Sequence, residues 1–178
     1  MANYLETLLF FGDKTLARTS ALSREEIRAL LDGHRPCFRA SSRNGFSADC
    51  IAAMLAAQGS DRSHLDFMAS KGDWPHALWA AVLPFENLPT IAESIDSLLA
   101  WSAHSIPRVT RILDPDCAEE IEEALKAPEI CANPNNAKGT DQDGYGARFI
   151  FSFLASIASL ARDAHASQRA LICLRGSG

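Results

Sequence analysis

The amino-acid sequence predicts an all-α fold, a single irregular bundle of about seven helices around a central apolar helix near residues 148–161. Three observations predict this class. Apolar residues recur with a period near 3.6, the segments between the periodic stretches are short, and alternating β-branched residues are almost absent. We expect residues 1–178 to form a single globular helical domain, because 178 residues is a typical length for one domain with its own core.

The first half of the chain carries several helix signals. Residues 4–11 fit a short amphipathic helix that a glycine ends. Ser23 and Glu26 match a capping box, which predicts the start of a second helix. Residues 34–46 are rich in turn-forming residues and are expected to form a loop. Residues 47–58 then predict an alanine-rich helix.

The second half predicts longer and more apolar helices. Residues 77–83 follow a cap-then-proline start and should form a mostly buried helix. A second capping box precedes a helix over residues 90–104, and residues 114–128 predict a helix with one apolar stripe and glutamates on its other faces. The central helix follows over residues 148–161. Residues 170–174 either extend that helix after a break or form a short strand.

Residues 128–146 are expected to form a long irregular loop within the domain. The stretch exceeds the about 12 to 15 residues of a typical structureless connection, and such loops often bind something or are disordered. Asp141, Asp143 and Gly144 match three positions of an EF-hand. The first carboxylate and the terminal glutamate of that motif are absent, so we predict no metal site. We also predict no cofactor, because no nucleotide-binding glycine pattern occurs.

The strongest anomaly in the sequence is a cluster of acidic residues. Between Asp114 and Glu129 there are seven acidic residues and one lysine, a net charge of −6 in a chain whose total is −5. A solvated helix face is the ordinary explanation. The alternative is a surface that meets a basic protein, since charge complementarity speeds encounter and excludes wrong partners. The residues expected to bind such a partner are Asp116, Glu119, Glu120, Glu122 and Glu123.

We therefore expect a small acidic binding protein that docks on a basic protein partner and can inhibit it, as immunity proteins and antitoxins do. Phe85 or Tyr145 is expected to supply an apolar anchor. The alternative is an enzyme or ligand sensor that binds a small anionic molecule under the loop of residues 128–146. Its anion-binding residues would be Arg35, Arg39 and Arg43, which share one face if their segment is helical.

Charge and composition argue against several other classes. A net charge of −5 disfavours nonspecific binding to nucleic acid. No apolar run reaches the about 20 residues of a membrane span, and the first residues lack a basic leader, so we expect a cytoplasmic location without membrane binding. Five cysteines without a close pair are expected to stay reduced. The very apolar residues 77–83 and 149–161 also leave a homodimer open.

No catalytic residue is predicted. Cys37 with His34 is the best candidate for a nucleophile and its base, because the nearby arginines would lower the pKa of the thiol. A nucleophile elbow, a phosphate-binding loop and a zinc-protease motif are all missing. An enzyme is therefore the less favoured reading, although cysteine–histidine partners can meet in a fold without being neighbours in sequence.

Overall fold

The protein has a mixed α/β fold, and a computed structural model describes residues 5–14, 22–61, 63–69, 79–113, 118–136, 144 and 146–177. The four strands in these ranges form one antiparallel sheet in the order β2-β1-β4-β3. Their bounds are β1 (Leu5–Asp13), β2 (Phe38–Arg43), β3 (Trp79–Leu83) and β4 (Ala170–Ser177). The predicted all-α bundle is therefore wrong.

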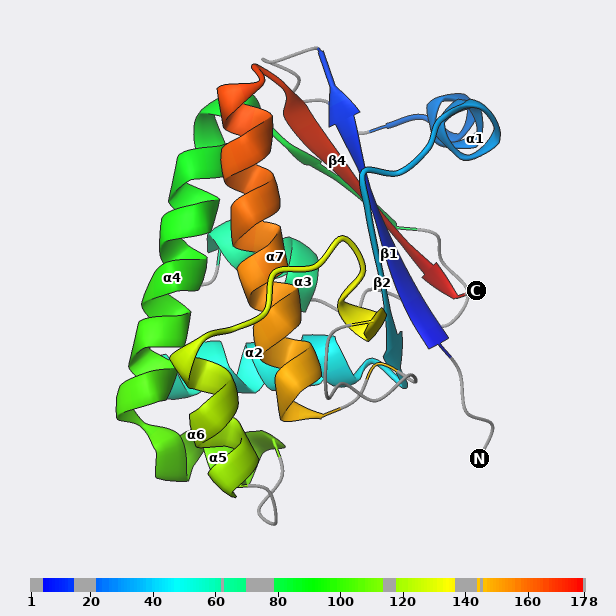
Figure 1. Ribbon diagram of the computed structural model, residues 1–178. Helices are drawn as coiled ribbons and strands as arrows, with labels where there is room; N and C mark the ends of the chain where they lie inside the picture. The colour runs from blue at the N-terminus through cyan, green and yellow to red at the C-terminus, as the bar shows by residue number, and fades with distance from the viewer. Residues whose placement is uncertain are drawn as a thin grey trace.

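The helices in the described ranges lie on both sides of the sheet. Helices α2 to α7 cover one face, whereas α1 alone packs on the opposite face (Figure 1). The α-helices are α1 (Arg24–Gly33), α2 (Phe46–Gln58), α3 (Asp66–Ala69), α4 (Leu88–His104), α5 (Ile106–Leu113), α6 (Ala118–Lys126) and α7 (Ala147–Ala166). Three short 3-10 helices are η1 (Ser63–Leu65), η2 (Phe85–Asn87) and η3 (Pro134–Asn136).

Strand β1 occupies most of the segment for which the sequence predicts a first helix. Its side chains alternate, so that Leu8 and Phe10 face the helical layer, whereas Leu9 and Phe11 face α1. A strand that is covered on both faces has apolar residues at consecutive positions of its sequence. Such a run also satisfies the spacing of an amphipathic helix, and this ambiguity explains the wrong prediction.

Three further segments also belong to the sheet. Strand β2 lies within residues 34–46, where turn residues predict a loop. Strand β3 lies within residues 77–83, where the sequence predicts a helix; residues 77 and 78 lie outside the described ranges. Alanine and leucine favour helices there, but pairing with β4 overrides this weak preference. Residues 170–174 form part of β4, which settles the choice between helix and strand.

The main core lies between the sheet and α7. Helix α7 contains the apolar segment 149–161, and it lies beside α4 across the middle of the sheet (Figure 1). Phenylalanine rings connect the two layers: the Phe10 and Phe38 rings of neighbouring strands meet edge to face at 5.7 Å, and the Phe38 ring lies 6.5 Å from that of Phe153 on α7. These contacts fix the helices on the sheet.

A smaller apolar cluster holds α1 on the other face. Phe11, Ile172 and Leu174 are buried there, and Ile27 and Leu30 of α1 pack against them. The predicted capping box is present: the Ser23 hydroxyl accepts from the Glu26 amide, and the Glu26 carboxylate accepts from the Ser23 amide. Every residue of α1 keeps some exposure, so this helix is the least buried of the long ones.

Residues from the 128–146 segment cover the outer edge of β2. The Asn135 side chain accepts a hydrogen bond from the Ser41 amide at 2.9 Å and donates one to the Ser41 carbonyl at 2.8 Å, as a neighbouring strand would. Further along, the Arg43 amide donates to the Gly144 carbonyl at 3.3 Å. A Cβ atom at Gly144 would lie 1.8 Å from the Ser41 carbonyl oxygen, and the φ of +67° also requires glycine. This arrangement protects the edge from pairing with other chains.

Candidate functional site

Helix α6 carries the predicted partner-binding residues. Its apolar side is fixed in the core by Ile121 and Ala124, which are buried, whereas Glu122 and Glu123 are exposed. Asp116 lies outside the described residues, and Glu119 and Glu120 belong to the first turn of α6. The exposed glutamates face solvent because their positions on the helix lie between those of the buried residues.

The chain that leaves α6 exposes an apolar side chain that the sequence reasoning missed. Ile130 is 64% exposed, which makes it the most exposed large hydrophobic residue in the described ranges. The segment is held against α7 by a hydrogen bond of 2.9 Å from the Cys131 amide to the Ser156 hydroxyl. Glu129, which is also exposed, precedes Ile130. The sequence did contain a signal for this exposure. Ile130 stands between the end of a helix and a polar loop, and it has no periodic apolar neighbours.

The two anchors that the sequence suggests are not confirmed. Phe85 is half-buried, and its ring stacks on that of His165 at 4.4 Å with an interplanar angle of 11°. Tyr145 lies outside the described residues. Ile130 is therefore the better placed apolar side chain near α6.

A pocket of about 280 Å³ lies between the end of α6 and the first turns of α7. Ala127 and Phe151 form part of its apolar wall, and Glu129, Arg148 and Ser152 supply polar groups. The Ser152 residue is only 2% exposed, and its hydroxyl has no hydrogen-bond partner of normal geometry among the described residues. The pocket therefore offers a buried hydroxyl that can donate or accept one more hydrogen bond.

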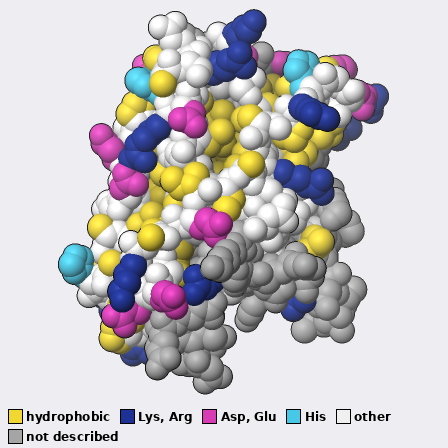
Figure 2. Space-filling view, viewed as in Figure 1, with side chains coloured by type: hydrophobic (Ala, Val, Ile, Leu, Met, Phe, Trp, Pro, Cys, Tyr) yellow, Lys and Arg dark blue, Asp and Glu magenta, His cyan; other side chains and the backbone are white. Residues whose placement is uncertain are grey.

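Charges of both signs surround this pocket. The Arg148 guanidinium lies 3.4 Å from the Glu123 carboxylate, which is 74% exposed. Figure 2 shows acidic and basic side chains interspersed over the part of the surface where α6 lies. Residues 114–129 carry seven acidic groups and one lysine, so that the region remains at −5 even when Arg148 is added to their net charge of −6. The net charge of these residues together is therefore negative.

Cysteine chemistry at this pocket is not activated. Burial raises the pKa of the Cys131 thiol, and although the neighbouring Ser152 hydroxyl acts to lower it, burial has the larger effect. The other candidate, Cys37, donates a hydrogen bond of 3.1 Å to the Phe10 carbonyl, and burial raises its pKa as well. The His34 ring lies 3.4 Å from the Ala29 carbonyl. Neither thiol has the lowered pKa that a nucleophile requires at neutral pH.

The three arginines of the alternative site do not share a helix. Arg35 is exposed between α1 and β2, whereas Arg39 and Arg43 belong to β2, opposite Leu9 and Leu5 of β1. Four residues of strand span about 13 Å, compared with the about 6 Å that separates such positions on a helix. Arg39 and Arg43 therefore share a face of the sheet, but they do not converge on one small anion.

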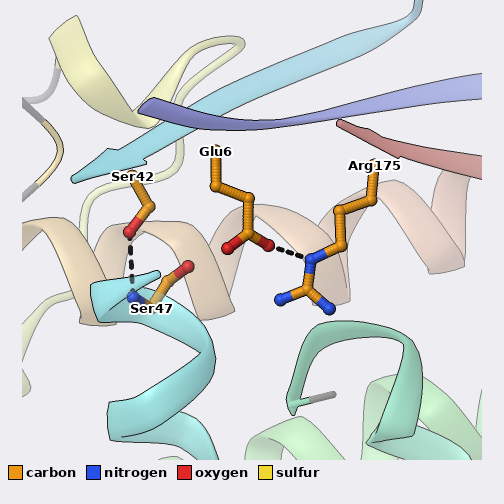
Figure 3. Close-up of polar contacts among 4 residues, drawn as sticks. All are labelled: Glu6, Ser42, Ser47 and Arg175. Carbon is orange, nitrogen blue, oxygen red and sulfur yellow. Dashed lines mark hydrogen bonds and ion pairs between the residues drawn. The ribbon is translucent and has the colours of Figure 1, made fainter. Parts of the chain in front are cut away.

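The most buried charges of the described residues lie on the inner face of the sheet. Glu6 of β1 and Arg175 of β4 point toward the helical layer and form an ion pair there (Figure 3). Close by, the Ser42 hydroxyl accepts a hydrogen bond of 2.9 Å from the Ser47 amide in the first turn of α2 (Figure 3). The Ser42 hydroxyl thus takes the role of the N-cap side chain of α2, because the N-cap residue, Gly45, has no side chain. The hydrogen bond between Ser42 and Ser47 joins the sheet to α2, whereas the ion pair links β1 to β4 within the sheet.

The described part of the chain contains neither a cluster of metal ligands nor a membrane-spanning helix. Among the residues that the structure describes, no group of three or more histidine, cysteine, aspartate and glutamate side chains could hold a metal ion. Asp141 and Asp143 lie outside them. No helix in the described ranges is long and apolar enough to cross a membrane.

No protein-family model matches the chain, and comparison with curated proteins and with solved structures gives no match.

Proposed function

We propose that the protein binds a basic protein partner through a surface that we call the α6 surface. It consists of Glu122 and Glu123 of α6, of Glu129 and Ile130, and of the mouth of the adjoining pocket. The observation that carries the proposal is the 64% exposure of Ile130 beside acidic side chains. An apolar centre surrounded by a polar, solvent-accessible rim is the common arrangement of a protein–protein interface.

The two parts of the α6 surface would act at different stages of binding. The excess negative charge around α6 would attract a basic partner over a distance of about 8 Å at physiological salt, and so would raise the rate of encounter. Ile130 would then be buried by the partner and would slow dissociation. If the covered surface of the partner includes its active site, binding inhibits it by occlusion, as immunity proteins and antitoxins do.

The pocket would receive one side chain of the partner. Its apolar wall suits the stem of a lysine or arginine, while Glu129 at the mouth could pair with the charged end. The buried Ser152 hydroxyl would accept one further hydrogen bond. Arg148 would not oppose this strongly, since Glu123 already lies against it.

A cytoplasmic location belongs to the same proposal. Four cysteines in the described ranges, Cys37, Cys50, Cys131 and Cys173, are free thiols. Free thiols are typical of proteins in reducing compartments, where disulfides rarely persist. A partner would then be met inside the cell.

The proposal is tested with matched charge-reversal variants of the tagged chain. Glu122→Lys combined with Glu129→Lys changes the charge of the α6 surface by four units. As a control, Glu25→Lys combined with Asp32→Lys makes the same change of charge on α1. Both side chains are exposed, and α1 lies on the other side of the sheet. Each protein is used to capture partners from a lysate of the source cells at low and moderate salt, and captured proteins are identified by mass spectrometry.

We expect the wild-type chain and the α1 variant to capture the same basic protein, and the α6 variant to lose it. With the purified partner, the association rate of the α6 variant at low salt should be lower than that of the wild-type chain by about tenfold or more. Ile130→Ser should instead speed dissociation about tenfold, since the loss of a buried anchor costs about 1 to 2 kcal/mol. Equal capture by all variants, or a partner that is acidic, would rule the proposal out.

A small anion in the same pocket is a second candidate function, because the pocket lies under the first residues of the 128–146 segment and Arg148 lines it. Its weakness is the Glu123 carboxylate 3.4 Å from the Arg148 guanidinium, which competes with any anion. A thermal shift with millimolar phosphate or citrate that disappears in Arg148→Gln would support it. No shift in the wild-type chain would exclude it.

A further inference from the structure

The two edges of the sheet are treated differently. The edge of β2 is covered by Asn135 and Gly144, and β2 also carries Arg39 and Arg43. Covering segments and charged side chains are the usual means by which proteins keep an edge strand from pairing with another chain. The edge formed by β3 has neither protection in the part of the chain that the structure describes.

Strand β3 is uncharged, and within the described ranges it pairs on one side only. Its sequence, Trp79–Leu83, reads WAAVL and contains no charged residue and no proline. Its register places Ala81 opposite Cys173 and Val82 opposite Ile172 of β4, and no described residue pairs with its other side. Ala80, Ala81 and Val82 each keep part of their surface exposed. Such an edge is a ready template for a further strand.

A cleft runs beside this strand on the helical side of the sheet. It has a volume of about 240 Å³ and is bounded by residues 81–84, by Phe67 of α3 and by Ile91 of α4. His64 and Asp66 form part of its rim. A strand added to β3 would cover the mouth of this cleft with every second side chain, because alternate residues of a strand point to the same face.

We propose that β3 pairs with β3 of a second copy of this chain, so that two four-stranded sheets join into one. A two-fold axis through Ala81 makes the pairing antiparallel, with Ala80 opposite Val82 of the other copy. This register brings only apolar residues together, and the same surface serves on both copies, as a two-fold interface requires. Each copy carries a net charge of −5, but β3 itself has no charged residue, and the acidic α6 packs mainly on α4, α5 and α7.

The length of the strand sets the expected strength of the dimer. Five residues give about 17 Å of edge, which is short for the about 800 Å² that each partner buries in a standard interface. The walls of the cleft must add to the contact. We therefore expect a reversible dimer with a dissociation constant in the micromolar range rather than a permanent one.

The first test is sedimentation equilibrium of the full chain from about 1 μM to about 500 μM, a range that brackets the expected dissociation constant. The wild-type chain should pass from monomer to dimer. Val82→Lys places a charge on the edge and should raise the dissociation constant at least tenfold. Val82→Thr keeps the β-branched shape without charge and should dimerise like the wild-type chain. Circular dichroism confirms that both variants are folded.

The second test fixes the register. In directly opposed residues of antiparallel strands the Cα atoms are about 4.5 to 5.5 Å apart, which suits a disulfide. Both variants are made in a Cys173→Ala background, because the native Cys173 lies opposite Ala81 in β4 and could otherwise form a disulfide within the chain. Ala81→Cys should then form a covalent dimer on mild oxidation, whereas Val82→Cys, opposite Ala80, should not. A wild-type chain that stays monomeric throughout the range, or a dimer that Val82→Lys leaves intact, would overturn the proposal. Crosslinking of Val82→Cys in preference to Ala81→Cys would overturn the register.

Discussion

Removal of one member of the Glu6–Arg175 pair should be among the most destabilising substitutions in this protein. The two residues are 1% and 2% exposed, so water does not screen the charge that is left behind. Breaking a buried ion pair from one side costs about 3 to 5 kcal/mol, against about 5 to 15 kcal/mol for the whole free energy of unfolding of a typical domain. We expect Glu6→Gln to lower the free energy of unfolding by about 3 kcal/mol.

The assay is urea unfolding followed by far-ultraviolet circular dichroism, with thermal unfolding as a second measure. A loss of about 3 kcal/mol corresponds to a fall in Tm of about 6 to 12 °C for a chain of this size. The matched control is Asp96→Asn, which breaks the ion pair between Asp96 of α4 and Arg162 of α7. Their side chains are 52% and 50% exposed, so this loss should stay below about 1 kcal/mol.

The double variant separates the cost of a lone buried charge from the value of the pair. Glu6→Leu with Arg175→Met replaces both charges by apolar side chains of similar length, and such replacements are often neutral or stabilising by about 1 to 4 kcal/mol. We expect it to be close to the wild-type chain in stability. The reasoning is refuted if Glu6→Gln costs no more than Asp96→Asn, or if the double variant is as unstable as the sum of the two single ones.

Two further predictions concern the covered edge and the buried thiols. Asn135→Ala removes both hydrogen bonds to the backbone of Ser41 and should cost about 1 to 3 kcal/mol in urea unfolding, with faster hydrogen exchange at the Ser41 amide; unchanged exchange would show that Asn135 does not hold this edge. Burial raises the pKa of Cys50 from 9.0 to about 12, so the unfolded chain releases this proton first and stability should fall as the pH rises above about 9. Cys50→Ala should flatten that fall by up to about 1.4 kcal/mol per pH unit, measured by urea unfolding between pH 8 and 11; an identical slope in both proteins would contradict it.

Helices with clear local signals could be predicted from the sequence. The capping box of Ser23 and Glu26 begins α1, and the apolar segment 149–161 lies within α7. In both cases the information is local, because a cap satisfies amides one turn away and an apolar run of that length exceeds a normal strand.

The strands could not be predicted in the same way, because their pairing partners are far apart in sequence. Strand β1 pairs with β4 across more than 150 residues, and its apolar run fits a helix equally well. Strand β2 did carry a usable signal: buried Phe38 and Ala40 alternate with Arg39 and Ser41. Neighbouring turn residues hid that alternation.

The candidate site was predicted only in part for the same reason. The acidic cluster is a property of one segment and is visible in the sequence. The pocket requires α6 and α7 to meet, and the exposure of Ile130 depends on where Cys131 is tied to Ser156. Neither contact is local, so neither can be read from periodicity.

The buried ion pair also bears on why β1 pairs with β4 in one register. Both faces of β1 are apolar, with Leu8 and Phe10 on one side and Leu9 and Phe11 on the other. A slip of one residue exchanges the two faces, and hydrophobicity alone would penalise it weakly. The same slip would place the Glu6 and Arg175 side chains on opposite faces of the sheet, so that neither charge would have its partner. We infer that the pair contributes little net stability and selects the register, which is why the double apolar variant is expected to remain stable while each single variant does not.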